Sequence, residues 1–123
     1  MKASPSALQW LRSYYDAIDN LRFDEVAEFL HEDCACQYPS GAVIAGRERF
    51  IRSGRRDLGA LQGIRHELRD AWEEGEELIF ELVVTYWRED GAKIVRPGVG
   101  IFVLDDDRIR AQRLFVDARG VWD

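Results

Sequence analysis

The segment from Ile64 to Asp117 reads as four β-strands in series, and both faces of these strands are apolar. Within Leu78–Arg88, one alternating set of side chains is Phe80, Leu82, Val84 and Tyr86, and the other contains Glu81 as its only charge. A strand with one solvated face alternates apolar and polar residues, so this pattern indicates a sheet that is covered on both faces. We expect helices from the preceding residues to cover one face and a second copy of the chain to cover the other.

Helices are predicted before these strands. Ser4 followed by Pro5 is typical of a helix start, because serine caps the first turn and proline fits the first helical position. A second, short helix is expected to begin at Asp24 and to end at His31–Asp33, and a third is expected at Gly46–Leu58. The predicted strands are Cys34–Tyr38, Ala42–Ala45, Ile64–Trp72, Leu78–Arg88, Lys93–Leu104 and Arg108–Asp117, with a turn at Pro39–Gly41 between the first two.

This order of elements predicts an α+β fold: a cone-shaped, strongly bent antiparallel sheet with about three N-terminal helices that close a pocket. Pro97, Gly98 and Gly100 lie inside one predicted strand, where they indicate a bend or a bulge. A chain of 123 residues can bury a core of its own, so we expect residues 1–123 to form a single domain.

Composition excludes several classes of partner. The net charge of −6 argues against nucleic acid, because phosphate binding depends on clustered cations. No apolar run is long enough to span a bilayer, and Met1–Trp10 lacks the apolar stretch of a signal peptide. With only two cysteines, we expect a cytoplasmic protein. The local arginine cluster is interpreted as a solvated helix face; it comprises Arg47, Arg49, Arg52, Arg55 and Arg56.

Several short motifs carry a family resemblance. They are Tyr14–Ile18 followed by Phe23–Asp24, Ala45–Arg47 at the start of the third helix, and the closing run Arg113–Asp117. Together with the order of elements, they make the chain similar to the nuclear transport factor two-like superfamily, in its polyketide-cyclase (SnoaL-like) and ketosteroid-isomerase branch. The resemblance covers nearly the whole chain and implies the cone fold, whereas function varies widely across such a fold.

The resemblance also bears on chemistry. Ketosteroid isomerases use a helix tyrosine as an oxyanion donor, an aspartate base and a second, protonated aspartate, and the resemblance places these at Tyr14, Tyr38 and Gly100. Limonene epoxide hydrolases use one arginine and two aspartates, whose positions here are Leu82, Val84 and Leu114. Side chains without a titrating atom cannot transfer protons, so neither classical activity is expected.

The inward-facing residues of the predicted cone form an apolar hollow with a few polar tips, as in many small-molecule sites. We predict His66 as a proton shuttle, with a buried histidine satisfied by a neighbouring oxygen as the alternative. Tyr14 and Tyr38 are predicted to donate to a substrate oxygen, or else to be amphipathic core residues. The predicted substrate-binding residues are Cys36, Phe80, Leu82, Val84, Tyr86, Arg96, Phe102, Gln112 and Leu114.

Neither a metal nor a cofactor is expected. Cys34 and Cys36 lie on one strand face and could be joined by His31 and His66, but two cysteines without a second pair are weak evidence for zinc. Buried, unreactive thiols are the simpler interpretation.

Two functions therefore remain open. One is an isomerase, cyclase or lyase that acts on an apolar carbonyl compound. The other is a non-catalytic module that binds an apolar ligand or serves as a dimeric interaction domain. In both cases the expected partners are an apolar small molecule and a second copy of the chain, which contacts the outer sheet face around Val99.

Overall fold

The computed structural model of the chain describes residues 1–38 and 41–123, and over these residues it contains three helices and six strands. Pro39 and Ser40 of the predicted turn lie outside the described residues. The helices are α1 (Pro5–Asp19), α2 (Phe23–Glu28) and α3 (Arg47–Gly59). The strands are β1 (Leu30–Gln37), β2 (Val43–Ala45), β3 (Gly63–Glu74), β4 (Glu77–Trp87), β5 (Lys93–Asp105) and β6 (Arg108–Val116).

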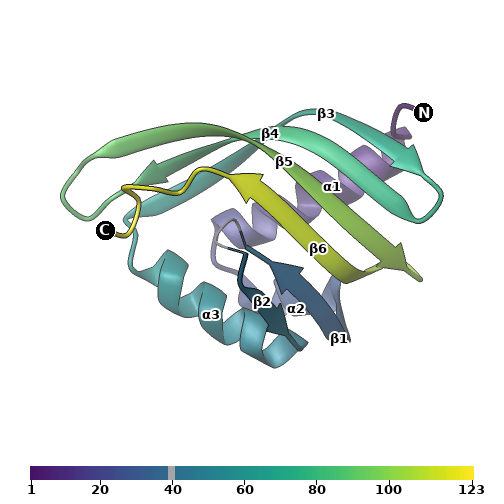
Figure 1. Cartoon of the computed structure of the whole chain (residues 1–123), viewed down its shortest axis with the longest axis horizontal. Helices are drawn as coiled ribbons and strands as arrows, with labels where there is room; N and C mark the ends of the chain where they lie inside the picture. Colours follow the sequence, from purple (N-terminus) through teal and green to yellow (C-terminus); the bar gives the residue numbers. More distant parts are fainter. Residues whose placement is uncertain (39–40) are drawn as a thin grey trace.

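The six strands form one curved sheet in the order β2-β1-β6-β5-β4-β3. Figure 1 shows the three helices gathered on the same side of this sheet. The predicted α+β class is thus confirmed, with one difference: β1 and β6 are parallel, so the sheet is mixed. Parallel neighbours need a long crossover connection, and α3 with the β3–β5 meander provides it.

Local sequence explains where α1 begins. The Ser4 hydroxyl accepts a hydrogen bond from the Ala7 amide at 3.2 Å, and Pro5 occupies the first turn, as predicted. Leu11, Tyr14 and Ile18 then recur at helical spacing and are all buried against the sheet.

The predicted end of the second helix is wrong. His31–Asp33 belong to β1, and α2 ends earlier, at Glu28. The Phe29 carbonyl accepts a hydrogen bond from the Ile109 amide at 2.7 Å, which joins the chain to the sheet directly after the helix. Pairing with β6 therefore overrides the low strand propensity of this polar segment.

The alternation in β4 is as predicted. Phe80, Leu82 and Val84 are buried beneath the helices, whereas Glu81 is exposed on the outer face. The bulge expected at Pro97–Gly100 is absent from the described pairing, since β5 keeps its register with β4 through these residues.

Gly100 does not mark a bulge; it leaves space for the ring of a residue on the neighbouring strand. It pairs with Phe80 across the strands, and a Cβ atom at this position would lie 2.1 Å from the Phe80 ring. Only glycine leaves room for that ring. The register shifts that curve the sheet lie elsewhere, between Leu68 and Asp70 and between Val103 and Leu104.

The layer between sheet and helices has two halves. Next to the β3–β4 hairpin it is filled by aromatic rings, which we call the closed half; its rings belong to Trp10, Phe29, Phe80 and Phe102. Phe80 and Phe102 meet edge to face with centroids 4.8 Å apart, and Trp10 meets Phe29 at 5.4 Å. The other half, towards the β4–β5 hairpin and the C-terminal segment, contains the cavity described below, and we call it the open half.

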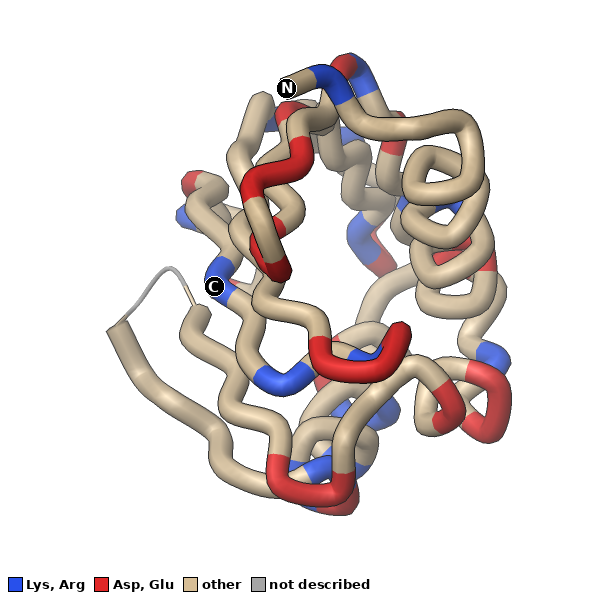
Figure 2. The backbone as a smooth tube through the Cα atoms, turned by 90° about the vertical axis from the view of Figure 1, so that its right-hand side faces the viewer, with Lys and Arg blue, Asp and Glu red and all other residues tan. Residues whose placement is uncertain are grey.

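Figure 2 shows the acidic residues in short runs, several of them at turns. Within the described residues, no helix combines the length and apolarity that crossing a bilayer requires.

Candidate functional site

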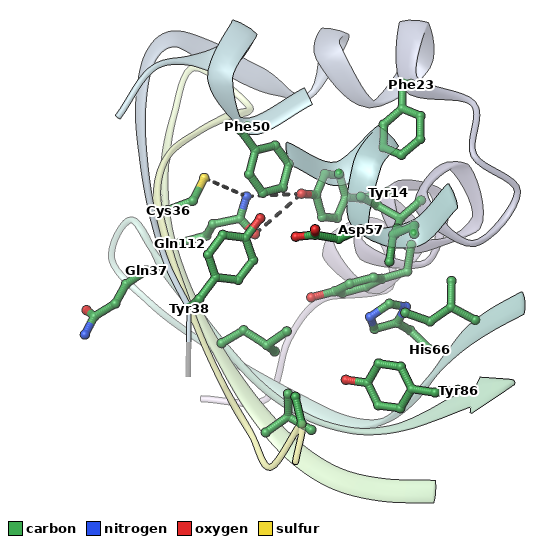
Figure 3. Close-up of a pocket in the computed structure, with 18 of the residues that line it drawn as sticks. Tyr14, Phe23, Cys36, Gln37, Tyr38, Phe50, Asp57, His66, Tyr86 and Gln112 are labelled. Atoms are coloured by element: carbon green, nitrogen blue, oxygen red, sulfur yellow. Dashed lines mark hydrogen bonds between the residues drawn. The ribbon is translucent and has the colours of Figure 1, made fainter. Parts of the chain in front are cut away.

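The open half contains a cavity of about 130 Å³ (Figure 3). Its walls come from α1, α2, α3, the strands β1, β3, β4 and β6 and the C-terminal segment, and they are mostly aromatic or aliphatic. All four tyrosines of the chain line it. The polar side chains among its lining residues are Tyr14, Tyr15, Gln37, Tyr38, Asp57, His66, Tyr86, Gln112 and the indole of Trp122.

His66 lies in the wall of the cavity and is held by Asp19. The His66 Nδ1 atom is 2.6 Å from Asp19 Oδ1, and the His66 amide donates to Asp19 Oδ2 at 2.7 Å. The two side chains are 6% and 15% exposed, so the pair is nearly shielded from solvent. A carboxylate that accepts from Nδ1–H fixes the imidazole orientation and leaves Nε2 as the proton acceptor.

Tyr15 also holds the imidazole of His66 in place. The His66 ring stacks on Tyr15, with centroids 4.3 Å apart and planes tilted by 24°. Among the described residues, His66 Nε2 has no hydrogen-bond partner, yet no buried side-chain nitrogen or oxygen there lacks one. The Nε2 atom is therefore accessible rather than sealed in protein, as a proton-transferring group requires.

Behind the dyad lies a second hollow, between α1 and the β3 edge of the sheet. It is lined by His66 and Asp19 together with charged residues such as Arg12 and Glu67. His66 thus lines both the apolar cavity and this polar groove, and Asp19 lies on the side of the groove.

Tyr14 belongs to a buried hydrogen-bonding chain. Gln112 Nε2 donates to the Tyr14 hydroxyl at 3.1 Å and contacts Cys36 Sγ at 3.2 Å (Figure 3). Burial raises the pKa of Tyr14 well above its ordinary value, with Tyr15 adding to the effect. Tyr14 therefore stays protonated, with its hydroxyl engaged by Gln112.

The two cysteines are free thiols. Their mutual hydrogen bond lowers the pKa of Cys34 and, together with burial, raises that of Cys36. Within residues 1–38 and 41–123, no three His, Cys, Asp or Glu side chains come together as metal ligands would.

Tyr38 and Tyr86 complete the polar lining. Burial raises the pKa of each to about 12, opposed in Tyr38 by a hydrogen bond with Ser53 and in Tyr86 by the charge of Arg96. Both hydroxyls are therefore neutral donors at neutral pH.

The C-terminal segment closes one side of the cavity. Trp122 donates from Nε1 to the Asp57 carbonyl of α3 at 2.8 Å, and its ring meets Tyr86 edge to face at 5.9 Å. Arg88 donates to the Gly120 carbonyl, which ties the segment to the end of β4. Figure 1 shows the C-terminus beside the connection from α3 to β3.

The structure brings together only some of the residues predicted from the sequence. The predicted site residues that line the cavity are Tyr14, Cys36, Tyr38, His66, Tyr86, Gln112 and Leu114. The rest do not line it: Phe80, Leu82, Val84 and Phe102 are buried in the core, and Arg96 hydrogen-bonds the Val95 carbonyl at 3.3 Å.

Sequence reasoning missed Asp19, Tyr15, Asp57 and Trp122. One signal was available for Asp19: it follows Tyr15 by four residues, so the two side chains share a helix face. Nothing in the sequence marked Trp122, because its contact with α3 depends on how the last residues fold back.

Comparisons with known proteins agree with this architecture. Residues 11–112 match the model of the SnoaL-like domain. A protein with a ketosteroid isomerase-like fold from Catenulispora acidiphila, solved with trimethylamine, superposes with a TM-score of 0.84 at 13% identity, covering 97% of this chain and 91% of that one. A search of curated proteins found no significant match.

Two further structures show the same fold. A protein assigned as a SnoaL-like polyketide cyclase from Shewanella denitrificans has a TM-score of 0.84 at 13% identity, with 94% and 93% of the two chains covered. An epoxide hydrolase of M. tuberculosis that resembles limonene epoxide hydrolase has a TM-score of 0.80 at 22% identity, with 94% and 86% covered.

Proposed function

We propose that this chain, which belongs to the SnoaL-like domain family, is an isomerase, cyclase or lyase that moves a proton on a small apolar carbonyl compound. The observation that carries the proposal is the His66–Asp19 pair in the wall of the cavity. His66 Nε2 takes a proton from the carbon next to the carbonyl. The electron pair of the broken C–H bond forms the C=C bond of an enolate, and the π pair of the carbonyl moves onto its oxygen. The imidazolium, stabilised by Asp19, returns the proton to carbon.

The size of the cavity limits the substrate. Engineered protein cavities of roughly 150 Å³ hold a benzene-sized molecule, and this cavity measures about 130 Å³. We therefore expect a compound of about one ring rather than a steroid or a polycyclic polyketide. The trimethylamine bound by the Catenulispora relative is a ligand of comparably small size.

Neither classical activity of related enzymes is part of this proposal. The positions that correspond to the catalytic acids of ketosteroid isomerases carry Tyr38 and Gly100, and Phe80 occupies the space next to Gly100. Leu82, Val84 and Leu114 stand where limonene epoxide hydrolases have charged residues. Donation by Tyr14 and Tyr38 to a substrate oxygen stays a prediction.

Proton exchange tests the proposed function directly. Single-ring ketones incubated with the protein in D₂O should exchange the hydrogens next to the carbonyl, which proton NMR detects as signal loss. His66→Ala should slow this exchange about 10²- to 10⁴-fold, the usual range for a general base. Asp19→Asn should also slow it, because an amide that donates to Nδ1 holds the imidazole in the tautomer whose Nε2 carries the proton.

His31→Ala is the matched control, since His31 lies outside the cavity and contacts Asp105 at the far end of β5. Equal exchange by the His66 and His31 variants would remove His66 as the base. An absence of wild-type exchange with every ketone, combined with ligand binding in the cavity, would favour the non-catalytic binding module instead.

A homodimer through the outer sheet face is the second part of the proposal. Val95, Val99 and Phe115 are 48%, 38% and 47% exposed on adjacent strands, which is unusual for apolar side chains in the middle of a sheet. Glu81 and Arg113 are exposed on this face with opposite charges, so a two-fold contact between copies can pair them.

Solution size tests the dimer. The wild type should have twice the monomer mass at micromolar concentration, and Val99→Arg should give a monomer because it introduces an unpaired charge into the contact. Val43→Arg is the control, since Val43 is also exposed but lies on β2 at the sheet edge. A monomeric wild type, or a Val99→Arg dimer, would contradict this arrangement.

A further inference from the structure

The four tyrosine hydroxyls that reach the cavity differ in their surroundings. Tyr14 is hydrogen-bonded to Gln112, and Tyr38 interacts with Ser53. Tyr15 stacks its ring on His66, and its hydroxyl has no hydrogen-bond partner among the described residues. The hydroxyl of Tyr86 likewise has none, and Tyr86 lies beside His66 in the sheet, as shown below.

Tyr86 is nonetheless a buried residue. Its side chain is only 3% exposed, and Trp122 packs against its ring. Every sealed side-chain oxygen in the described part of the chain has a partner, so the Tyr86 oxygen must be open to the cavity. Figure 3 shows this hydroxyl pointing into the pocket. A hydroxyl that is open to the cavity and has no protein partner is free to donate to a ligand oxygen.

The base is close to this hydroxyl. In the β3–β4 ladder, Ile64 pairs with Tyr86 and His66 pairs with Val84, so Tyr86 and His66 are diagonal neighbours on the same face. Diagonal neighbours lie about 7–8 Å apart at the backbone, and side chains of this length reach across that gap. A carbonyl group and its adjacent carbon can therefore contact both residues at once.

We infer that Tyr86 is a catalytic residue: it donates a hydrogen bond to the carbonyl oxygen of the substrate while His66 removes the neighbouring proton. The inference rests on the proposed function and names the group that stabilises the negative charge developing on the substrate oxygen. As the C–H bond breaks, the oxygen becomes an enolate, and a hydrogen bond to an anionic oxygen is stronger than one to a neutral carbonyl. Tyr14, whose hydroxyl is already paired with Gln112, mainly positions that side chain.

The ionised form of 4-nitrophenol is a suitable probe, because it is one ring in size and its oxygen imitates an enolate. Its binding to the protein can be titrated through the visible absorbance of the phenolate. Tyr86→Phe should weaken binding about 10- to 100-fold, as expected for the loss of a hydrogen bond to a charged group. Tyr14→Phe should weaken it several-fold less, and His31→Ala should leave it unchanged.

A crystal structure of the wild type with 4-nitrophenol provides a second measurement that does not depend on how the variants fold. The Tyr86 hydroxyl should lie about 2.5–2.7 Å from the phenolate oxygen. Equal binding by Tyr86→Phe, a larger loss in Tyr14→Phe, a phenolate bound to another hydroxyl, or no binding by the wild type would each overturn the inference.

The two proposals fail in different ways. If His66→Ala abolishes proton exchange while Tyr86→Phe binds the phenolate like wild type, the base stands and Tyr86 is removed from the mechanism. If Tyr86→Phe loses phenolate binding while His66→Ala still exchanges protons, Tyr86 remains the residue that binds the oxygen, and His66 is not the base.

Discussion

The closed and open halves of the layer share the helix α1 and the strand β4, yet one is solid and the other contains a cavity. Phe80 and Phe102 fill the closed half completely, and both are 0% exposed. In the open half the same inward positions of β3 and β4 carry His66 and Tyr86, whose polar tips face a cavity. The difference lies in the side chains. Aromatic rings without polar atoms pack tightly against one another, whereas rings with hydroxyl or imidazole groups need hydrogen-bond partners that other rings cannot provide, and the cavity lies beside these groups.

The largest expected effect is on the closed half. Phe102→Ala removes a ring that contacts Trp10, Tyr14 and Phe80, and it should lower the free energy of unfolding by about 3–5 kcal/mol. Chemical denaturation measures this loss. A loss under about 1 kcal/mol would mean that the closed half is not the stabilising core.

Alkaline pH should affect the open half alone, because its tyrosines titrate and the rings of the closed half do not. The pKa of Tyr86 is raised to about 12 from 10.0, so the folded state holds this proton more tightly than the unfolded chain. Stability is therefore full below about pH 10 and falls as the pH rises towards 12, by on the order of 2–3 kcal/mol for this group. Denaturation of wild type and Tyr86→Phe across this range measures the difference, and identical slopes would contradict it.

Gly100→Ala tests why the closed half is solid. The new methyl group would overlap the Phe80 ring and should cost about 1–3 kcal/mol of stability. Gly59→Ala is the control, since a Cβ atom there meets nothing within 4 Å. Combining Gly100→Ala with Phe80→Leu should recover part of the loss, whereas an unaffected single variant would show that the ring can move aside freely.

The smallest expected effect on stability is at the mouth of the open half. Trp122 is 48% exposed, so Trp122→Ala should lower the free energy of unfolding by only about 1 kcal/mol through its hydrogen bond to Asp57. It should, however, speed dissociation of 4-nitrophenol, measured by stopped flow. A slower or unchanged release rate would show that the C-terminal segment does not close the cavity.

Much of the fold could be predicted because the informative patterns are local. Ser4 and Pro5 marked the start of α1, and the alternation in Leu78–Arg88 gave the correct phase of β4. The end of the second helix was predicted wrongly at His31–Asp33. These polar residues belong to β1 because of pairing with β6, about eighty residues further along the chain. The candidate site was predicted in part: His66 was expected on the inward face and lines the cavity, whereas its contact with Asp19 was not expected.

What the sequence by itself determined is which side chains face inward, because a period of two in a strand and of about four in a helix follows from backbone geometry. It did not determine which inward residues become core and which line a cavity. That depends on contacts between distant segments: Phe80 fits only because Gly100 lies across from it, and His66 meets a carboxylate 47 residues away. Tertiary packing therefore decides which inward residues fill the core and which line the cavity, because whether a space is filled depends on all the side chains that reach it.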